Sequence, residues 1–282
     1  MISGTDKGTP QTFILLQIRG VIQLKFKMMK KITLTPLSFF LVIVCFSISA
    51  CSKDDIKEKP YVLVTATGDI QAELHTFRSL VGEKINTTPG VKGGRREINW
   101  DGIPDQLLNT KIPENFFNPT APGSPVQNQR GLVYSSIGEL RVSDNGFADV
   151  NPSAAGSFTP FSGNKTFSNI SARLWDVGFQ IAGQPQEAKV KGFGIVFSDV
   201  DLANKTFLEF FADDKSLGKF FVPPHDNNTN FSFLGVYFNA PVVTRIRVGH
   251  DGVIAEGKND ISNGGPEDLV VMDDFIYSEP EK

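Results

Sequence analysis

The sequence predicts an all-β protein, an antiparallel β-sandwich that carries one short helix near its N-terminal side. Phenylalanine is abundant, with 24 residues, and 26 glycines and 17 prolines are spread along the chain. From about residue 130 onward, short apolar runs alternate with Gly, Pro, Asn and Asp. Runs of this length and spacing are typical of antiparallel meanders and not of βαβ units.

Seven apolar runs are expected to be strands. Several have apolar residues on both faces, as burial inside a sandwich requires. Residues 206–221 are expected to form a hairpin, because Asp213 and Asp214 supply turn chemistry between two alternating runs. The expected strands are 131–144, 189–200, 206–212, 217–222, 231–238, 242–250 and 269–277.

One helix is expected over about residues 70–81. Asp69 is a suitable N-terminal cap, and Ile70, Leu74, Phe77 and Val81 recur at helical spacing on one face. Gly82 stands where a left-handed stop is favoured. We expect this helix to pack against one end of the sandwich.

The beginning of the chain has the layout of a bacterial lipoprotein signal peptide. Two lysines, Lys30 and Lys31, precede an uncharged stretch over about 32–46, and small residues precede Cys51. A membrane-spanning anchor needs about 20 apolar residues, and this stretch is shorter. We therefore expect residues 1–50 to be removed and Cys51 to carry lipid. Residues 1–27 fit no signal layout, which indicates an upstream start codon chosen wrongly.

The residues after Cys51 bear on where the protein is displayed. Ser52-Lys53-Asp54-Asp55 resembles the acidic export tag that follows the lipidated cysteine in surface lipoproteins of Bacteroidota. The resemblance implies anchoring in the bacterial outer membrane with the domain exposed at the surface. The alternative is a solvated tether over 51–60 on a protein that faces the periplasm. In either case, residues 61–282 are expected to form a single β-sandwich domain.

Removal of the first 50 residues changes the charge of the chain and its cysteine content. They hold six of the 28 Lys and Arg and one of the 31 Asp and Glu, which leaves a net charge of about −8. This charge argues against nucleic acid or an anionic membrane surface as a partner. Cys45 is removed and Cys51 carries lipid, so the folded domain has no disulfide.

Five segments resemble a family of uncharacterised secreted bacterial proteins. They are Arg95-Arg96-Glu97-Ile98-Asn99-Trp100-Asp101-Gly102, Pro-Glu-Asn-Phe-Phe-Asn at 113–118, Gly-Phe-Gly-Ile-Val-Phe-Ser-Asp-Val-Asp at 192–201, Phe-Leu-Gly-Val at 233–236, and Met-Asp-Asp-Phe-Ile-Tyr at 272–277. The resemblance covers about residues 61–280 and implies no agreed activity. The order of Phe-rich strands is also similar to jelly-roll modules of the galactose-binding and carbohydrate-binding type, which implies a jelly-roll-like sandwich. Fold analogy does not transfer function.

Four aspartates are candidate ligands of a structural calcium ion. Asp273 and Asp274 lie inside an apolar strand, where an unpaired buried carboxylate would cost several kcal/mol, roughly. Asp199 and Asp201 follow another strand. Ca²⁺ takes oxygen ligands and links strand ends to loops. The alternatives are a buried arginine partner for the last-strand acids and turn capping by Asp201.

A second polar cluster surrounds Trp100. Trp100 could stack on a sugar ring while Asn99 and Asp101 bond its hydroxyls, or the segment could be a structural plug anchored by the indole. Trp175 has the same two interpretations, exposed platform or core residue. In both cases we favour the structural one.

No reaction is indicated by the sequence. His75, His225 and His250 lack metal-ligand spacing, and no Gly-x-Ser-x-Gly motif occurs. We therefore expect a non-enzymatic protein that binds or adheres to a glycan or a protein partner. The alternatives are a hydrolase acting on polysaccharide through paired acids, such as Asp199 with Asp273, and a structural envelope protein without a small ligand.

Overall fold

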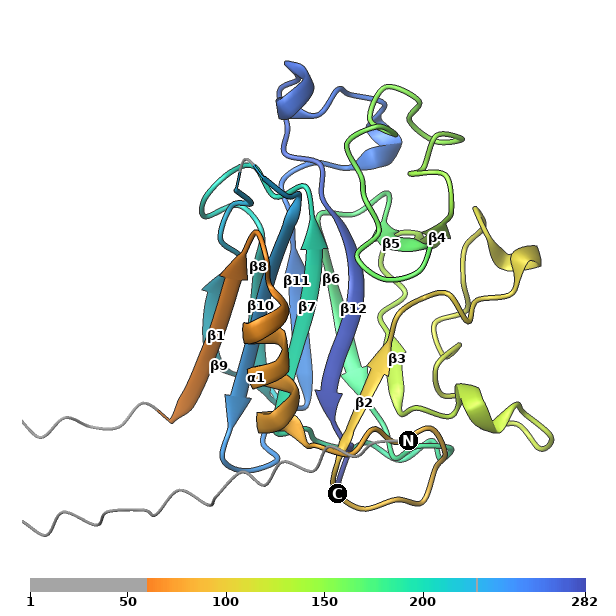
Figure 1. The fold of residues 1–282 in the computed structure, drawn as a ribbon. Coiled ribbons are helices and arrows are strands. Elements are labelled where there is room, and N and C mark those ends of the chain that lie inside the picture. Colours follow the sequence, from red (N-terminus) through yellow and green to blue (C-terminus); the bar gives the residue numbers. More distant parts are fainter. Residues whose placement is uncertain (1–59, 227) are drawn as a thin grey trace, which may run out of the picture. The chain divides into compact units, whose positions relative to one another are not determined.

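The strands form two antiparallel sheets that pack face to face, in a computed structural model that describes residues 60–226 and 228–282 (Figure 1). One sheet has seven strands, in the order β1-β10-β7-β12-β5-β4 with β2 paired to β12, and the other has five, in the order β3-β6-β11-β8-β9. The seven-stranded sheet contains β1 (Tyr61–Thr67), β2 (Arg95–Ile98), β4 (Leu140–Ser143), β5 (Thr166–Asn169), β7 (Gly192–Ser198), β10 (Phe231–Phe238) and β12 (Val271–Ser278). The five-stranded sheet contains β3 (Leu132–Tyr134), β6 (Leu174–Phe179), β8 (Phe207–Ala212), β9 (Lys215–Phe221) and β11 (Arg245–Gly249).

The prediction of an all-β antiparallel sandwich with one helix is confirmed. From β5 to β12 the chain crosses between the sheets at every connection except the β8–β9 hairpin. Such crossing is what a jelly-roll-like arrangement requires. The main core lies between the two sheets and is rich in phenylalanine, including Phe167, Phe193, Phe210 and Phe275.

Two differences from the expected strands have a clear cause. Residues 131–144 do not form one strand, because a turn with Gly138 in a left-handed conformation separates β3 from β4, and the two halves enter different sheets. Four strands, β1, β2, β5 and β6, lie outside the expected runs. These segments are short or contain polar residues, and their pairing depends on distant partners such as β10 and β12.

The helix forms close to where it was expected, as α1 (Gln71–Val81). Its buried face, Leu74, Phe77 and Val81, lies on the outer face of the seven-stranded sheet and not at one end of the sandwich. The Phe77 ring occupies the space above Gly194 and Gly235, where an added Cβ would approach the ring to 2.9 and 2.7 Å. The small residues of β7 and β10 thus let the helix approach the sheet.

The β8–β9 hairpin has its turn at Asp213 and Asp214, and Ala212 pairs with Lys215. Asp213 has a φ of 52°, a left-handed conformation that Asp tolerates better than most residues. The prediction of this hairpin is confirmed.

Strand β12 lies at the centre of the seven-stranded sheet, and all eight of its residues are buried. On one edge it pairs with β7, and on the other with β5 near its start and β2 near its end. Its register with β7 shifts between Met272 and Phe275, so Asp273 and Asp274 occupy a bulge.

The Trp100 indole fills the gap between β5 and β2 beside this bulge. Its Nε1 donates a hydrogen bond of 2.7 Å to the Asp273 carbonyl oxygen. The ring stacks on Phe167 at 3.9 Å between centroids and meets Phe275 edge-on. Trp100 therefore supplies the bulged strand with the hydrogen-bond donor that a neighbouring strand would otherwise provide.

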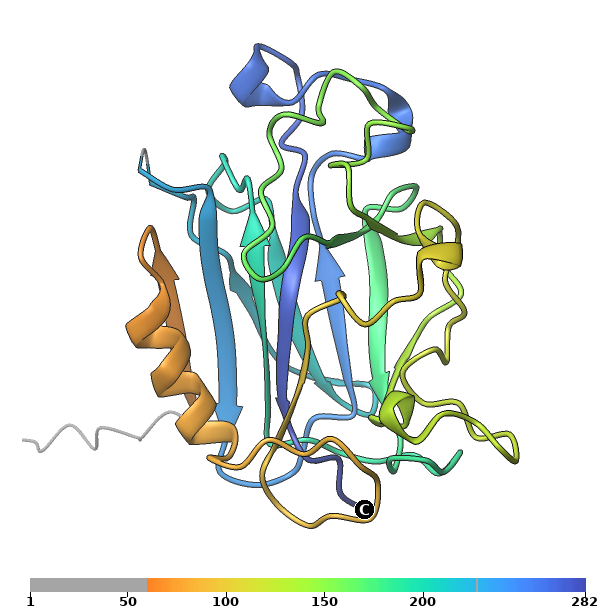
Figure 2. The same ribbon diagram turned by 45° about the vertical axis from the view of Figure 1, so that its right-hand side comes forward.

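The signal peptide, Cys51 and the tether are outside the described residues. Within 60–226 and 228–282, no helix is long and apolar enough to span a membrane. The loops before β12 and between β4 and β5 gather at one end of the sandwich, and residues 279–282 lie at the other (Figure 2).

Trp100→Phe should lower the free energy of unfolding by about 2 to 3 kcal/mol, because it leaves the buried Asp273 carbonyl without its donor. Trp175→Phe is the matched control, since the Trp175 indole nitrogen has no hydrogen-bond partner in the described chain. It should cost only the lost packing, about 1 kcal/mol. Urea denaturation measures both. An equal or larger loss in Trp175→Phe would contradict the role given to the Trp100 hydrogen bond.

Candidate metal centre and polar hollow

Four aspartates and one histidine converge at the loop end of the sandwich. Asp199 and Asp201 follow β7, and His225 lies between β9 and β10. Asp260 begins a 3-10 turn, Ile261–Asn263, and Asp268 precedes β12. We call these five residues the acidic centre. They form two groups, Asp199 with Asp201 and His225, and Asp201 with Asp260 and Asp268, and the ligating atoms of each group lie within 4.8 Å of one another.

Backbone amides orient two of these carboxylates. Asp268 accepts hydrogen bonds from the N–H groups of Asp201 and Leu202, at 3.1 and 2.9 Å. Asp260 accepts from the N–H groups of Leu269 and Ser262, at 2.7 and 2.8 Å. These bonds fix the loops around the acidic centre and leave the carboxylates with further lone pairs.

In the described chain, the carboxylates of Asp199 and Asp201 accept no such backbone hydrogen bonds, and Asp199 is the more deeply buried of the two. Asp199 is 2% exposed, and its Oδ2 has no hydrogen-bond partner among the described residues. Its Oδ1 lies 3.9 Å from Nε2 of His225. An orphaned buried carboxylate oxygen facing other carboxylates is strongly unfavourable unless a proton or a cation neutralises it.

The electrostatics of the acidic centre reflect this crowding. Burial first, and then the charges of Asp260 and Asp201, raise the pKa of Asp199 to about 8. Burial also raises the pKa of Asp268 to about 6, against the opposing effect of its backbone donors. The pKa of Asp201 is raised as well, mainly by burial and by Asp260. The acidic centre is thus a concentration of negative charge that is poorly compensated by the protein.

His225 is oriented toward the carboxylates. Its Nδ1 lies 2.6 Å from the Asp226 carbonyl oxygen, which makes Nδ1 the donor, and its Nε2 lies 3.0 Å from Oδ1 of Asp201. A carbonyl that fixes one ring nitrogen while the other faces ligating atoms is the usual surrounding of a metal-binding histidine. Burial lowers the pKa of His225, but the Asp226 carbonyl and the two aspartates outweigh it and the pKa is raised.

The structure brings together only half of the expected metal ligands. Asp199 and Asp201 belong to the acidic centre, and these residues with His225 could hold a metal ion. Asp273 and Asp274 belong to no group of three ligating residues in the described chain. Asp260, Asp268 and His225 were not expected, since each is an isolated residue in the sequence and no spacing pattern marks it.

Asp273 and Asp274 instead hold the loop before β5 against the sheet. Oδ2 of Asp273 accepts hydrogen bonds from the N–H groups of Phe161 and Ser162, at 2.6 and 3.2 Å. Asp274 accepts from the Ser162 hydroxyl at 2.6 Å and contacts Arg78 at 3.4 Å. Backbone donors and an arginine are therefore the partners, as the alternative interpretation of these acids described. The arginine, Arg78, comes from α1.

Burial, and then the neighbouring Asp274 carboxylate, raise the pKa of Asp273 in the folded protein. The pKa of Asp273 in the unfolded chain is near 3.9, so above about pH 4 the folded state binds more protons than the unfolded state. The stability contributed by protonated Asp273 therefore falls as the pH rises from about 4 through the folded pKa. Asp273→Asn should therefore match the parent near pH 4 and exceed it by roughly 1 to 3 kcal/mol near pH 9. Urea denaturation across pH tests this, with exposed Asp144→Asn as control. A constant difference across pH would contradict it.

The residues expected around a sugar site do not form one. Trp100 is 1% exposed and Trp175 is 0% exposed, so neither indole is available to stack on a ligand. Asp101 accepts a hydrogen bond from the Asn164 N–H at 2.9 Å, and Asn99 is exposed without forming a pocket with them. Trp100 and Asp101 act as a structural plug between β2 and the loop before β5. Trp175 packs in the core with Tyr134 and Phe167.

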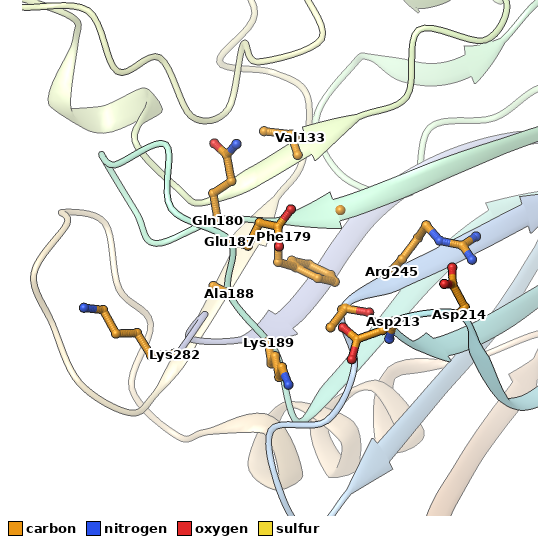
Figure 3. Close-up of a pocket in the computed structure, with 12 residues that line it drawn as sticks. Val133, Phe179, Gln180, Glu187, Ala188, Lys189, Asp213, Asp214, Arg245 and Lys282 are labelled. Carbon is orange, nitrogen blue, oxygen red and sulfur yellow. Dashed lines mark hydrogen bonds between the residues drawn. The ribbon is translucent and has the colours of Figure 1, made fainter.

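A polar hollow lies at the opposite end of the sandwich from the acidic centre (Figure 3). Its volume is about 600 Å³. Side chains from the end of β6, the β8–β9 turn, the start of β11 and residues 187–189 surround it. The charged residues that line it are Glu187, Lys189, Asp213, Asp214, Arg245 and Lys282. None of Asp199, Asp201, Asp273 and Asp274 lines it.

No protein-family model, curated protein or solved structure matches this chain. The resemblance to an uncharacterised secreted family therefore stays a prediction, and the functional argument depends on the geometry.

Proposed function

We propose that this protein is a cell-envelope lipoprotein that displays a non-catalytic β-sandwich for binding or adhesion, with a structural calcium ion in the acidic centre. The observation that carries the proposal is the orphaned Asp199 carboxylate, buried among Asp201, Asp260 and Asp268. Three of these four aspartates are almost completely buried, so a substrate could not reach them. The acidic centre is suited to holding loops together.

Calcium fits the ligands of the acidic centre better than other common cations. Four carboxylates supply hard oxygen ligands, and those of Asp199 and Asp201 each have an oxygen without a hydrogen-bond partner among the described residues. Ca²⁺ takes six to eight oxygen ligands at about 2.3 to 2.6 Å. A cation there would link the segment after β7 to the long connection between β11 and β12. The described domain contains no cysteine, so a bound ion would supply the cross-link that a secreted domain often obtains from disulfides.

The two alternative functions have less support. A retaining polysaccharide hydrolase needs two carboxylates about 5 Å apart that face a cleft. The candidates Asp199, Asp201, Asp273 and Asp274 line neither the polar hollow nor the second hollow described below. A purely structural envelope protein predicts a surface without an aromatic-lined groove. Phe179 lines the polar hollow, which supports a binding role over it.

Calcium should raise the melting temperature, and a chelator should lower it, because an ion that binds only the folded state stabilises it. At a calcium concentration of 100 times Kd the gain is about 2.7 kcal/mol. Asp199→Asn should lose this gain, and in chelator near neutral pH it should be at least as stable as the parent, because the parent must take up a proton to keep Asp199 buried. Differential scanning fluorimetry and calorimetric titration with Ca²⁺, Mg²⁺ and Zn²⁺ measure these effects.

Exposed Asp144→Asn serves as the control and should keep the full response to calcium. If neither stability nor titration heat responds to calcium in the parent, the calcium proposal fails. If zinc alone binds, His225 decides the selectivity and the cation is not calcium.

Anchoring is tested separately with Cys51→Ser in full-length protein expressed in a bacterium that processes lipoproteins. The parent should incorporate radiolabelled palmitate and sediment with membranes, and the variant should do neither. Protease added to intact cells then distinguishes surface display, which predicts cleavage, from attachment facing the periplasm. Equal labelling of the variant would refute the assignment of Cys51 as the lipid carrier.

A further inference from the structure

A second hollow adjoins the polar hollow at the same end of the sandwich. Its volume is about 490 Å³, and residues 90–92, 181–182 and 279–282 line it. Lys282 lines both hollows. Backbone hydrogen bonds of 2.7 and 2.8 Å between Lys189 and Glu281 run between them. We call the two hollows together the terminal groove, and each has the volume typical of a small-molecule site.

Five charged side chains at the polar hollow have no hydrogen-bond or ion-pair partner in the described chain. They are Glu187, Asp213, Asp214, Lys189 and Lys282. Figure 3 shows the two lysines and the two aspartates on different sides of the hollow. Side chains of opposite charge that surround one space without pairing are available to a ligand between them.

The polar hollow carries charges of both signs. Three acids, Glu187, Asp213 and Asp214, face two unpaired bases, Lys189 and Lys282. A third base, Arg245, is already neutralised by Asp176, whose Oδ2 lies 3.1 Å from the Arg245 Nη1. A polyanionic ligand would meet the acids, and a polycationic one the bases. A polar ligand without net charge can use both as hydrogen-bond partners.

Apolar residues also line the terminal groove. Phe179, Val133 and Ala188 line the polar hollow, and Ile181 and Pro280 line the second one. A sugar ring has hydroxyls at its rim and an apolar C–H face, so it matches a lining that combines apolar and charged residues. Carboxylates and ammonium groups there would accept from and donate to hydroxyls.

A peptide is less well suited to this place. A peptide that extends a sheet needs a free strand edge. The edge strand that lines the polar hollow, β3, is already occupied, since the Tyr134 N–H donates to the Glu114 carbonyl at 2.9 Å. The Leu132 N–H is directed to the Phe117 carbonyl at 3.4 Å.

We propose that the terminal groove binds an uncharged oligosaccharide, with Lys189 and Asp214 contacting its hydroxyls from opposite sides. This inference rests on the proposed function, because it names the ligand of the displayed domain. The groove lies at the other end of the sandwich from the acidic centre, so the two sites are tested independently.

The test applies the mature chain, with and without added calcium, to an array of immobilised uncharged and acidic oligosaccharides. Calorimetric titration follows with the uncharged oligosaccharides that bind. Lys189→Ala and Asp214→Ala should each weaken binding about tenfold, the loss of one good polar contact, about 1.4 kcal/mol. Both side chains lack partners, so the variants should keep the melting temperature of the parent. Asp144→Ala, an exposed acid away from the groove, should bind like the parent.

Binding of no uncharged oligosaccharide would overturn the inference, as would a preference for acidic ones. Unchanged affinity in both groove variants would overturn it too, because the ligand would then bind elsewhere. The calcium and lipid measurements have their own readouts and do not depend on these results. Failure of the glycan inference is therefore distinguishable from failure of the proposed function.

Discussion

The structure depends on one fully buried strand, β12, whose two faces are covered and whose two edges are paired. The inner face meets the five-stranded sheet, and the outer face lies under α1 and the loop before β5. Its bulge at Asp273 and Asp274 would leave backbone groups without partners, and the Trp100 indole and the Phe161 and Ser162 amides are directed to this place. Because buried polar groups must find partners, the bulge requires these contacts.

The two ends of the sandwich differ in chemistry because they differ in burial. At the loop end, carboxylates are enclosed by backbone and compete for neutralisation, which is the setting for a bound cation. At the other end, carboxylates and lysines stand around open hollows in contact with water, where they cost little and remain available to a ligand. A cation that stiffens one end and a groove that binds at the other are compatible in one domain, since the strands between them form a rigid core.

Apolar runs between turn residues were sufficient to predict the hairpin of β8 and β9 and the strands β7, β10, β11 and β12. Apolar residues at helical spacing were sufficient to predict the helix α1. It was insufficient for β2 and β5, which are four residues each and exist because β12 offers them a partner. In the acidic centre, Asp199 and Asp201 could be found because they follow a clear strand. In the sequence, His225 is 24 residues from Asp201 and Asp268 is 67 residues from Asp201. No local pattern predicts a contact between residues this far apart.

The sequence by itself determined the sandwich class, the turn chemistry and the layout of the predicted signal peptide, because periodicity, turn residues and charge are local properties. Only the tertiary structure decided which polar residues meet. It put Trp100 and Trp175 into the core, gave Asp273 backbone partners, and joined Asp199 to Asp260 and Asp268. The physical reason is that a side chain's chemistry depends on its burial and its neighbours, and both follow from contacts between segments far apart in the chain.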